Sequence, residues 1–136
     1  MEKLEKEDKA RMLDLKIYDL MNELYKMGKD LANDINKKSY IDVFKSNFLD
    51  DLEYILLELN FIEEIAEKFD LVLTTQEDIN EIKNLKGDER FKHFMPNNFN
   101  WEEQRFYTEE EENILNEKRN KILKGIIKRM KLEGKI

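Results

Sequence analysis

The chain has 136 residues, enough for one domain with a buried core, and 40% of them are charged, with a net charge of −7. It has no cysteine, which excludes disulfides, thiolate zinc sites and a cysteine nucleophile. Its apolar runs are too short for a transmembrane helix, and its first residues do not resemble a signal peptide. We therefore expect a cytoplasmic protein that does not bind a membrane.

A long first helix is predicted over about residues 7–36. Apolar residues such as Leu13 and Ile17 recur there every three or four positions, as on the buried face of a helix. A second stripe beside the first contains Gly28 and Ala32, where another backbone could approach closely. Because two stripes exceed what one neighbouring helix covers, the sequence also predicts a homo-oligomer formed through this helix.

A second long helix is predicted after Ser39, which would cap it with Asp42 as the partner in a capping box. This stretch is the most apolar of the chain and should form the centre of the core. Its pattern allows a continuous helix to Phe69 or a break near Asn60.

A short third helix is predicted over about residues 76–86. Residues 71–75 precede it and should form an extended connector, since a lone strand has nothing to pair with. Thr75 and Asp78 match a second capping box, and Gly87 suits the position that follows a helix.

An irregular, aromatic-rich segment is predicted at about residues 87–107. It either folds back over the end of the bundle and buries Trp101, or presents a recognition surface. The one histidine of the chain, His93, lies in it and is expected to be a partly buried structural residue. The aromatic residues of the segment are Phe91, Phe94, Phe99, Trp101, Phe106 and Tyr107.

A last helix is predicted from Thr108, which would cap it with Glu111. Acidic residues fill its first turn and basic residues its last turns, as the helix dipole favours. Apolar residues lie on one side of it and lysines on the other, so the helix is amphipathic and basic. Three interpretations remain: a solvated face, a nucleic-acid contact, and a dock for an acidic surface. The lysines are Lys118, Lys121, Lys124 and Lys128.

These elements together predict an all-α fold of four to five helices. Two long helices would form an antiparallel pair, with the C-terminal basic amphipathic helix packed on it. We expect a single helical domain over residues 1–136.

One short pattern resembles an enzyme family. Glu63-Glu64-x-x-Glu67, followed by Glu81-x-x-Asn84, is similar to the EExxE…ExxD pattern of the all-α nucleotide pyrophosphohydrolases, the MazG-like family. The resemblance implies carboxylates on two helices that hold metal ions against a nucleotide's phosphates. It covers about 22 residues, and Asn84 stands where the family has Asp.

The distribution of charge favours a different function. Residues 41–116 carry 20 acidic and 7 basic residues, whereas residues 117–136 carry 2 acidic and 8 basic residues. Carboxylates at helical spacing can imitate phosphates and compete for the basic cleft of a nucleic-acid-handling protein. In size, charge and helicity the chain resembles small phage-encoded inhibitors of bacterial defence, including anti-CRISPR proteins.

The sequence thus predicts a non-enzymatic protein-binding module with no cofactor, metal or small-molecule substrate. The alternatives are a nucleic-acid-binding regulator that uses the four lysines of the last helix, and a metal-dependent nucleotide pyrophosphohydrolase. The residues expected to bind the partner protein are Asp50, Asp51, Glu53, Glu63, Glu64, Glu67, Phe99 and Trp101.

Overall fold

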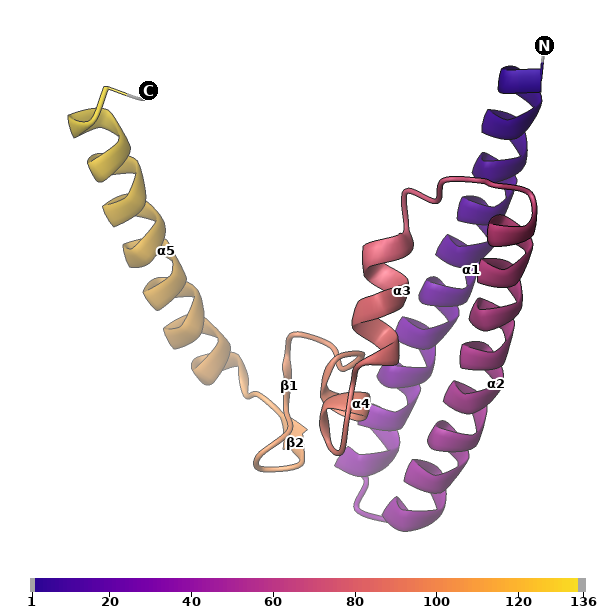
Figure 1. Ribbon diagram of the computed structural model, residues 1–136. Helices are drawn as coiled ribbons and strands as arrows, with labels where there is room; N and C mark the ends of the chain where they lie inside the picture. The colour runs from indigo at the N-terminus through magenta and orange to yellow at the C-terminus, as the bar shows by residue number, and fades with distance from the viewer. Residues whose placement is uncertain (1, 135–136) are drawn as a thin grey trace. The chain divides into compact units, whose positions relative to one another are not determined.

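The computed structural model describes residues 2–134 (Figure 1). These residues form two compact units, an N-terminal unit that ends at Asn97 and a C-terminal unit that begins at Asn98. The elements in chain order are α1 (Glu2–Asn36), α2 (Ile41–Lys68), α3 (Gln76–Lys83), α4 (Glu89–Lys92), β1 (Phe99–Asn100), β2 (Arg105–Phe106) and α5 (Glu109–Leu132).

The N-terminal unit is built on the antiparallel pair of α1 and α2, which lie side by side in Figure 1. The apolar stripe of α1 is buried against α2, with Ile17 and Leu24 fully inaccessible to solvent. The stripe of α2 is buried in the same way, with Leu59 at its centre. α2 continues without a break past Asn60, so the continuous alternative is the correct one.

The turn into α2 does not use the predicted cap. The N-cap position is occupied by Tyr40, in the left-handed conformation with φ of 53°, and no side chain caps the helix. The prediction of a capping box from Ser39 and Asp42 is therefore wrong, because the helix begins one residue later than that motif requires.

α3 is attached to α1 by a buried carboxylate. Asp14, on α1, accepts hydrogen bonds from the backbone N–H groups of Thr74 and Thr75, each at 3.2 Å. It also accepts bonds from the two hydroxyls, at 3.0 Å from Thr74 and 2.7 Å from Thr75. The Thr75 hydroxyl is thus bound to Asp14, and the predicted capping box of Thr75 with Asp78 does not form. α3 also ends at Lys83, three residues earlier than predicted.

The segment after α3 closes the end of the N-terminal unit. Phe91 and Phe94 are buried, and both rings contact Phe48 of α2, with ring centroids 5.5 and 6.2 Å apart. The backbone of Phe94 crosses Gly28 of α1 so closely that a Cβ atom on Gly28 would lie 2.0 Å from the Phe94 carbonyl oxygen. The predicted close approach of a backbone at Gly28 is confirmed. His93 is half-buried and its ring stacks on Tyr25, in keeping with a structural role.

The C-terminal unit consists of a short β-hairpin followed by α5. β1 and β2 pair antiparallel, with Phe99 opposite Phe106, and these two rings contact each other edge to face at 5.2 Å. Thr108 and Glu111 form the predicted capping box at the start of α5. No residue of α5 is buried.

The all-α class and the pairing of the two long helices are confirmed. The packing of the C-terminal helix on that pair stays a prediction. None of the helices within residues 2–134 is both long enough and apolar enough to cross a membrane.

Candidate protein-binding surface

The acidic residues predicted to bind a partner all lie on α2, but they do not share one side of it. An α-helix turns by about 100° per residue, so residues nine positions apart point in nearly opposite directions. Glu63 lies nine positions after Tyr54 and therefore points away from the side of α2 on which Tyr54 lies.

Glu63 points toward α3. Its carboxylate forms an ion pair with Lys83 and accepts a hydrogen bond of 2.7 Å from the side-chain amide of Gln76. Glu63 is half-buried there and serves to attach α3 to α2. Its carboxylate already has a cation, so it adds little free negative surface.

The opposite side of α2 combines apolar and acidic side chains. Tyr54, Leu57 and Phe61 recur at helical spacing, and their exposed fractions are 70%, 59% and 63%. Large exposed apolar patches are uncommon on soluble monomeric proteins. Where they occur, they usually mark a site of interaction. We call this surface the outer face of α2; it comprises Asp50, Glu53, Tyr54, Leu57, Glu58 and Phe61.

The outer face of α2 is hollowed. One depression is lined by Asp50, Glu53, Tyr54 and Leu57. A second shares Tyr54 and Leu57 with the first, and extends over Glu58, Phe61 and Ile62 to Lys16 of α1. The two depressions are therefore continuous along the helix.

A third depression lies between α1 and α2, nearer to the turn that joins them. Phe44, Phe48, Met27 and Leu31 give it an apolar floor. Carboxylates from both helices stand around this floor, namely Asp30, Asp34 and Asp51. The three depressions together are lined by six acidic residues and one lysine.

The carboxylates along this side form no ion pair within the described part of their own unit. Within residues 5–97, no Lys, Arg or His side chain lies within ion-pair distance of Asp50, Asp51, Glu53 or Glu58. Glu64 and Glu67 likewise form no ion pair within residues 5–97, and they are exposed but line none of these depressions. The structure thus places Asp50 and Glu53 of the predicted set on the outer face of α2, and Asp51 at the neighbouring depression between α1 and α2. Glu64 lies seven positions after Leu57 and so is on the same side of the helix as the outer face.

The two aromatic residues of the predicted set lie in the C-terminal unit. Phe99 is buried against Phe106, so its ring offers no exposed surface to a partner. Trp101 is half-buried in the turn of the hairpin. The side chains that sequence reasoning missed are Tyr54, Leu57 and Phe61, although their helical spacing on the side opposite the main stripe was visible in the sequence.

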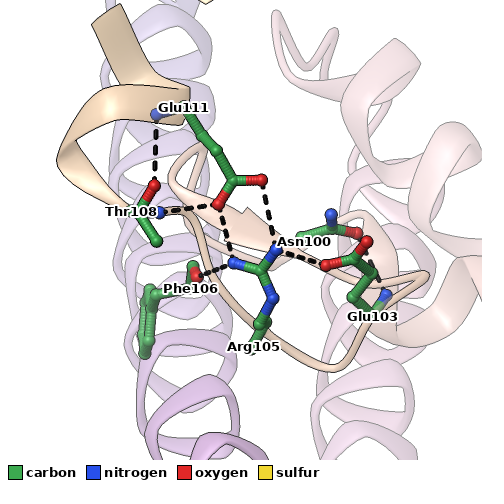
Figure 2. Close-up of polar contacts among 6 residues, drawn as sticks. All are labelled: Asn100, Glu103, Arg105, Phe106, Thr108 and Glu111. Carbon is green, nitrogen blue, oxygen red and sulfur yellow. Dashed lines mark hydrogen bonds and ion pairs between the residues drawn. The ribbon is translucent and has the colours of Figure 1, made fainter.

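A cluster of polar contacts links the hairpin to α5 (Figure 2). The guanidinium of Arg105 donates to both carboxylate oxygens of Glu111, at 2.7 and 3.1 Å, and forms an ion pair with Glu103. The hydrogen bonds from Arg105, with those from Thr108, lower the pKa of Glu111 to about 2. The same contacts raise the pKa of Arg105. This cluster fixes the first turn of α5 on the hairpin and is internal to the C-terminal unit.

The lysines predicted to contact nucleic acid in the alternative function are all exposed on α5. Lys118, Lys121, Lys124 and Lys128 have no ion-pair partner within the described residues 98–134. Apolar side chains are exposed on α5 as well, the most accessible in its middle being Ile122 at 64% and Leu123 at 55%.

The residues of the pyrophosphohydrolase-like pattern are not gathered around one point. Glu63 binds Lys83, whereas Glu64 is exposed on α2 one position further round the helix. Glu81 of α3 lies 3.8 Å from His93. Among the described residues, no group of three or more His, Asp and Glu side chains is placed to hold a metal ion.

Comparison of the chain with protein-family models, with curated proteins and with solved structures gave no match.

Proposed function

We propose that the protein is a non-enzymatic protein-binding module that uses the outer face of α2 to occupy a basic surface on a nucleic-acid-handling partner in the cytoplasm. The observation that carries the proposal is the row of exposed carboxylates on this face, which form no ion pair within residues 5–97 and alternate with exposed apolar side chains. Asp50, Glu53 and Glu58 supply the negative charge, and Tyr54 and Phe61 supply apolar contact area.

The physical basis is a division of roles between charge and apolar contact. Carboxylates that are fixed on a helix can bind to a basic cleft in the way that phosphates do. Long-range electrostatic attraction speeds the association. Aromatic side chains are the residue types enriched where binding energy concentrates in interfaces. A surface of this kind favours a protein cleft lined with lysine or arginine, in the manner of an acidic inhibitor or nucleic-acid mimic.

The test is competition between the partner and DNA. The immobilised protein is incubated with nuclease-treated bacterial lysate, and bound proteins are eluted with duplex DNA and identified. We expect a nucleic-acid-binding protein that DNA displaces, and whose capture is lost for the variant D50K/E53K/E58K. The control E7K/E77K/E117K makes the same change in net charge at exposed positions elsewhere and should retain the capture. Equal capture by both variants would contradict the proposal.

A second candidate function is nucleic-acid binding through α5, which is favoured by the four exposed lysines that form no ion pair within residues 98–134. In that case the purified protein should shift DNA or RNA in a gel, and its affinity should fall steeply with added salt. The variant K124E/K128E should abolish the shift, whereas D50K/E53K/E58K should leave or strengthen it.

A further inference from the structure

α5 has an apolar surface that is not buried within its own unit. One stripe of apolar residues on α5 comprises Leu115, Ile122 and Ile126, with Leu123, Ile127 and Met130 beside it, and every residue of the helix is at least partly exposed. Two arginines lie within this stripe, Arg119 between Leu115 and Ile122, and Arg129 three positions after Ile126. A helix packed into an ordinary core would place apolar residues at these positions, so the stripe suits a surface that is apolar and acidic.

The outer face of α2 has that composition. It presents exposed Tyr54, Leu57 and Phe61, with Asp50 and Glu58 on the same side. At 1.5 Å per residue, Arg119 and Arg129 lie about 15 Å apart along α5, and Asp50 and Glu58 lie about 12 Å apart along α2. The difference of about 3 Å is within the reach of arginine side chains, so both pairs can form at once.

The two surfaces also match in length. From Leu115 to Arg129 the stripe of α5 is about 21 Å long, and from Asp50 to Phe61 the outer face of α2 is about 17 Å long. The depressions along the outer face of α2 and between α1 and α2 provide room for the side chains of a helix laid over them. Recognition of an amphipathic helix by a hydrophobic groove, with charges at its edges, is a common mode of protein association.

We propose that the outer face of α2 binds α5 of a second copy of this chain. Because each copy carries both surfaces, two copies make the contact twice, which closes a symmetric dimer. Arg119 and Arg129 of one copy meet the acidic residues of the other, and the apolar stripe of α5 covers Tyr54, Leu57 and Phe61. This inference concerns the purified protein alone. Because the proposed function uses the same face, α5 of the second copy and the partner exclude each other there, and the partner binds the dissociated chain.

The first measurement is the mass of the purified full-length protein by light scattering, over about a hundredfold range of concentration. We expect the mass of two chains, each of 16.5 kDa, with dissociation on dilution and in high salt. The variant R119E/R129E should weaken the dimer by at least about tenfold, because each copy then opposes like charges at both contacts.

The matched control is K124E/K128E, which makes the same change in net charge. Lys124 lies five positions from each of the two arginines, about 140° round the helix, and Lys128 lies nine positions after Arg119, about half a turn away. This variant should therefore remain dimeric. Circular dichroism of each variant separates loss of the contact from loss of the helix.

A mixture of variants provides the decisive test. In the variant D50K/E58K, the outer face of α2 and the stripe of α5 both carry positive charge. In R119E/R129E, both surfaces carry negative charge. Each variant alone should therefore be a monomer, because its two surfaces repel each other. Mixed in equal amounts, they should form a complex of one copy of each. The proposal is overturned if the natural sequence has the mass of a single chain. It is also overturned if K124E/K128E dissociates as much as R119E/R129E, or if the mixture of the two variants stays monomeric.

Discussion

Asp14 of α1 binds Thr74 and Thr75, which lie 60 and 61 positions further along the chain. Burial raises the pKa of this carboxyl, but four hydrogen bonds from Thr74 and Thr75 outweigh that effect, so its pKa lies below the ordinary value. The ionised form is therefore the one that the fold stabilises. The carboxylate binds backbone N–H groups just before α3, which have no other partner of their own in the helix.

We expect Asp14→Asn to lower the free energy of unfolding by about 2–3 kcal/mol, because the amide leaves donors of the two threonines without an acceptor in a buried place. Urea unfolding at pH 7 measures the change. Asp19→Asn, at an exposed position on the same helix, is the control and should have little effect. Equal stability of the two variants would contradict the role given to Asp14.

The difference between the natural chain and Asp14→Asn should also depend on pH. A group whose pKa is lowered by folding contributes stability above its unfolded pKa, about 4 for aspartate, and loses that contribution as the pH falls through the folded value. The difference in free energy of unfolding should therefore be complete at neutral pH and narrow progressively in acid. A constant difference from neutral pH to about pH 2 would argue against the lowered pKa.

Gly28 shows how local preference and packing can oppose each other. Alanine favours a helix over glycine by about 1 kcal/mol, but a Cβ atom at Gly28 would meet the backbone of Phe94 at 2.0 Å. We expect Gly28→Ala to destabilise the protein by about 1–3 kcal/mol in thermal or urea unfolding, because the neighbouring backbone must move. Gly125→Ala in α5 has nothing within 4 Å of the added atom and should stabilise its helix instead.

At the scale of the element, α5 depends on its first turn. The capping box of Thr108 and Glu111 satisfies two N–H groups at the start of the helix, and Arg105 holds the glutamate from the hairpin (Figure 2). The negative charge in the first turn of α5 thus stabilises the start of the same helix, where the helix dipole favours anions.

We expect the carboxyl of Glu111 to titrate with a midpoint near pH 2 in an NMR experiment. Arg105→Gln should move that midpoint up, toward the ordinary value for glutamate of about 4.3, because the principal cause of the shift is removed. Lys118→Gln removes a cation outside the cluster and should leave the midpoint in place. A midpoint that is unchanged by Arg105→Gln would exclude the ion pair as its cause.

Sequence patterns predicted the positions of the helices well, but they predicted poorly which side chains form hydrogen bonds and ion pairs with each other. The spacing of apolar residues predicted α1 and α2 nearly to their ends, and the capping box of Thr108 and Glu111 predicted where α5 begins, because both patterns are local. The capping box predicted at Ser39 does not form because the turn places Tyr40 at the N-cap. The one predicted at Thr75 does not form because the Thr75 hydroxyl donates to Asp14 instead. These two residues are 61 positions apart, and no local pattern connects them. In the candidate site, charge identified Asp50, Asp51 and Glu53, whereas the pairing of Glu63 with Lys83 required the fold.

At the scale of the molecule, the chain divides between Asn97 and Asn98 into two compact units. The N-terminal unit contains its own core, its carboxylate link between α1 and α3, and the aromatic contacts that close its end. The C-terminal unit contains a small hairpin core and the exposed α5.

We therefore expect a fragment of residues 1–97 to fold alone and to unfold in a single cooperative transition, followed by circular dichroism. A fragment of residues 1–68 retains α1 and α2 but lacks Thr75, Phe91 and Phe94, so its transition should be broad and occur at lower temperature. A fragment 1–97 without a cooperative transition would show that the N-terminal unit is not self-sufficient.

The bond between Asp14 and the two threonines also constrains the order of folding. Closing a contact across 60 residues is entropically costly unless the intervening chain is already folded back on itself. The helical hairpin of α1 and α2 brings these positions together, so α3 can dock only after the hairpin has formed. The amide protons of Thr74 and Thr75 should consequently exchange with solvent earlier than those in the middle of α1, which makes them reporters of the undocking of α3 while the hairpin stays intact.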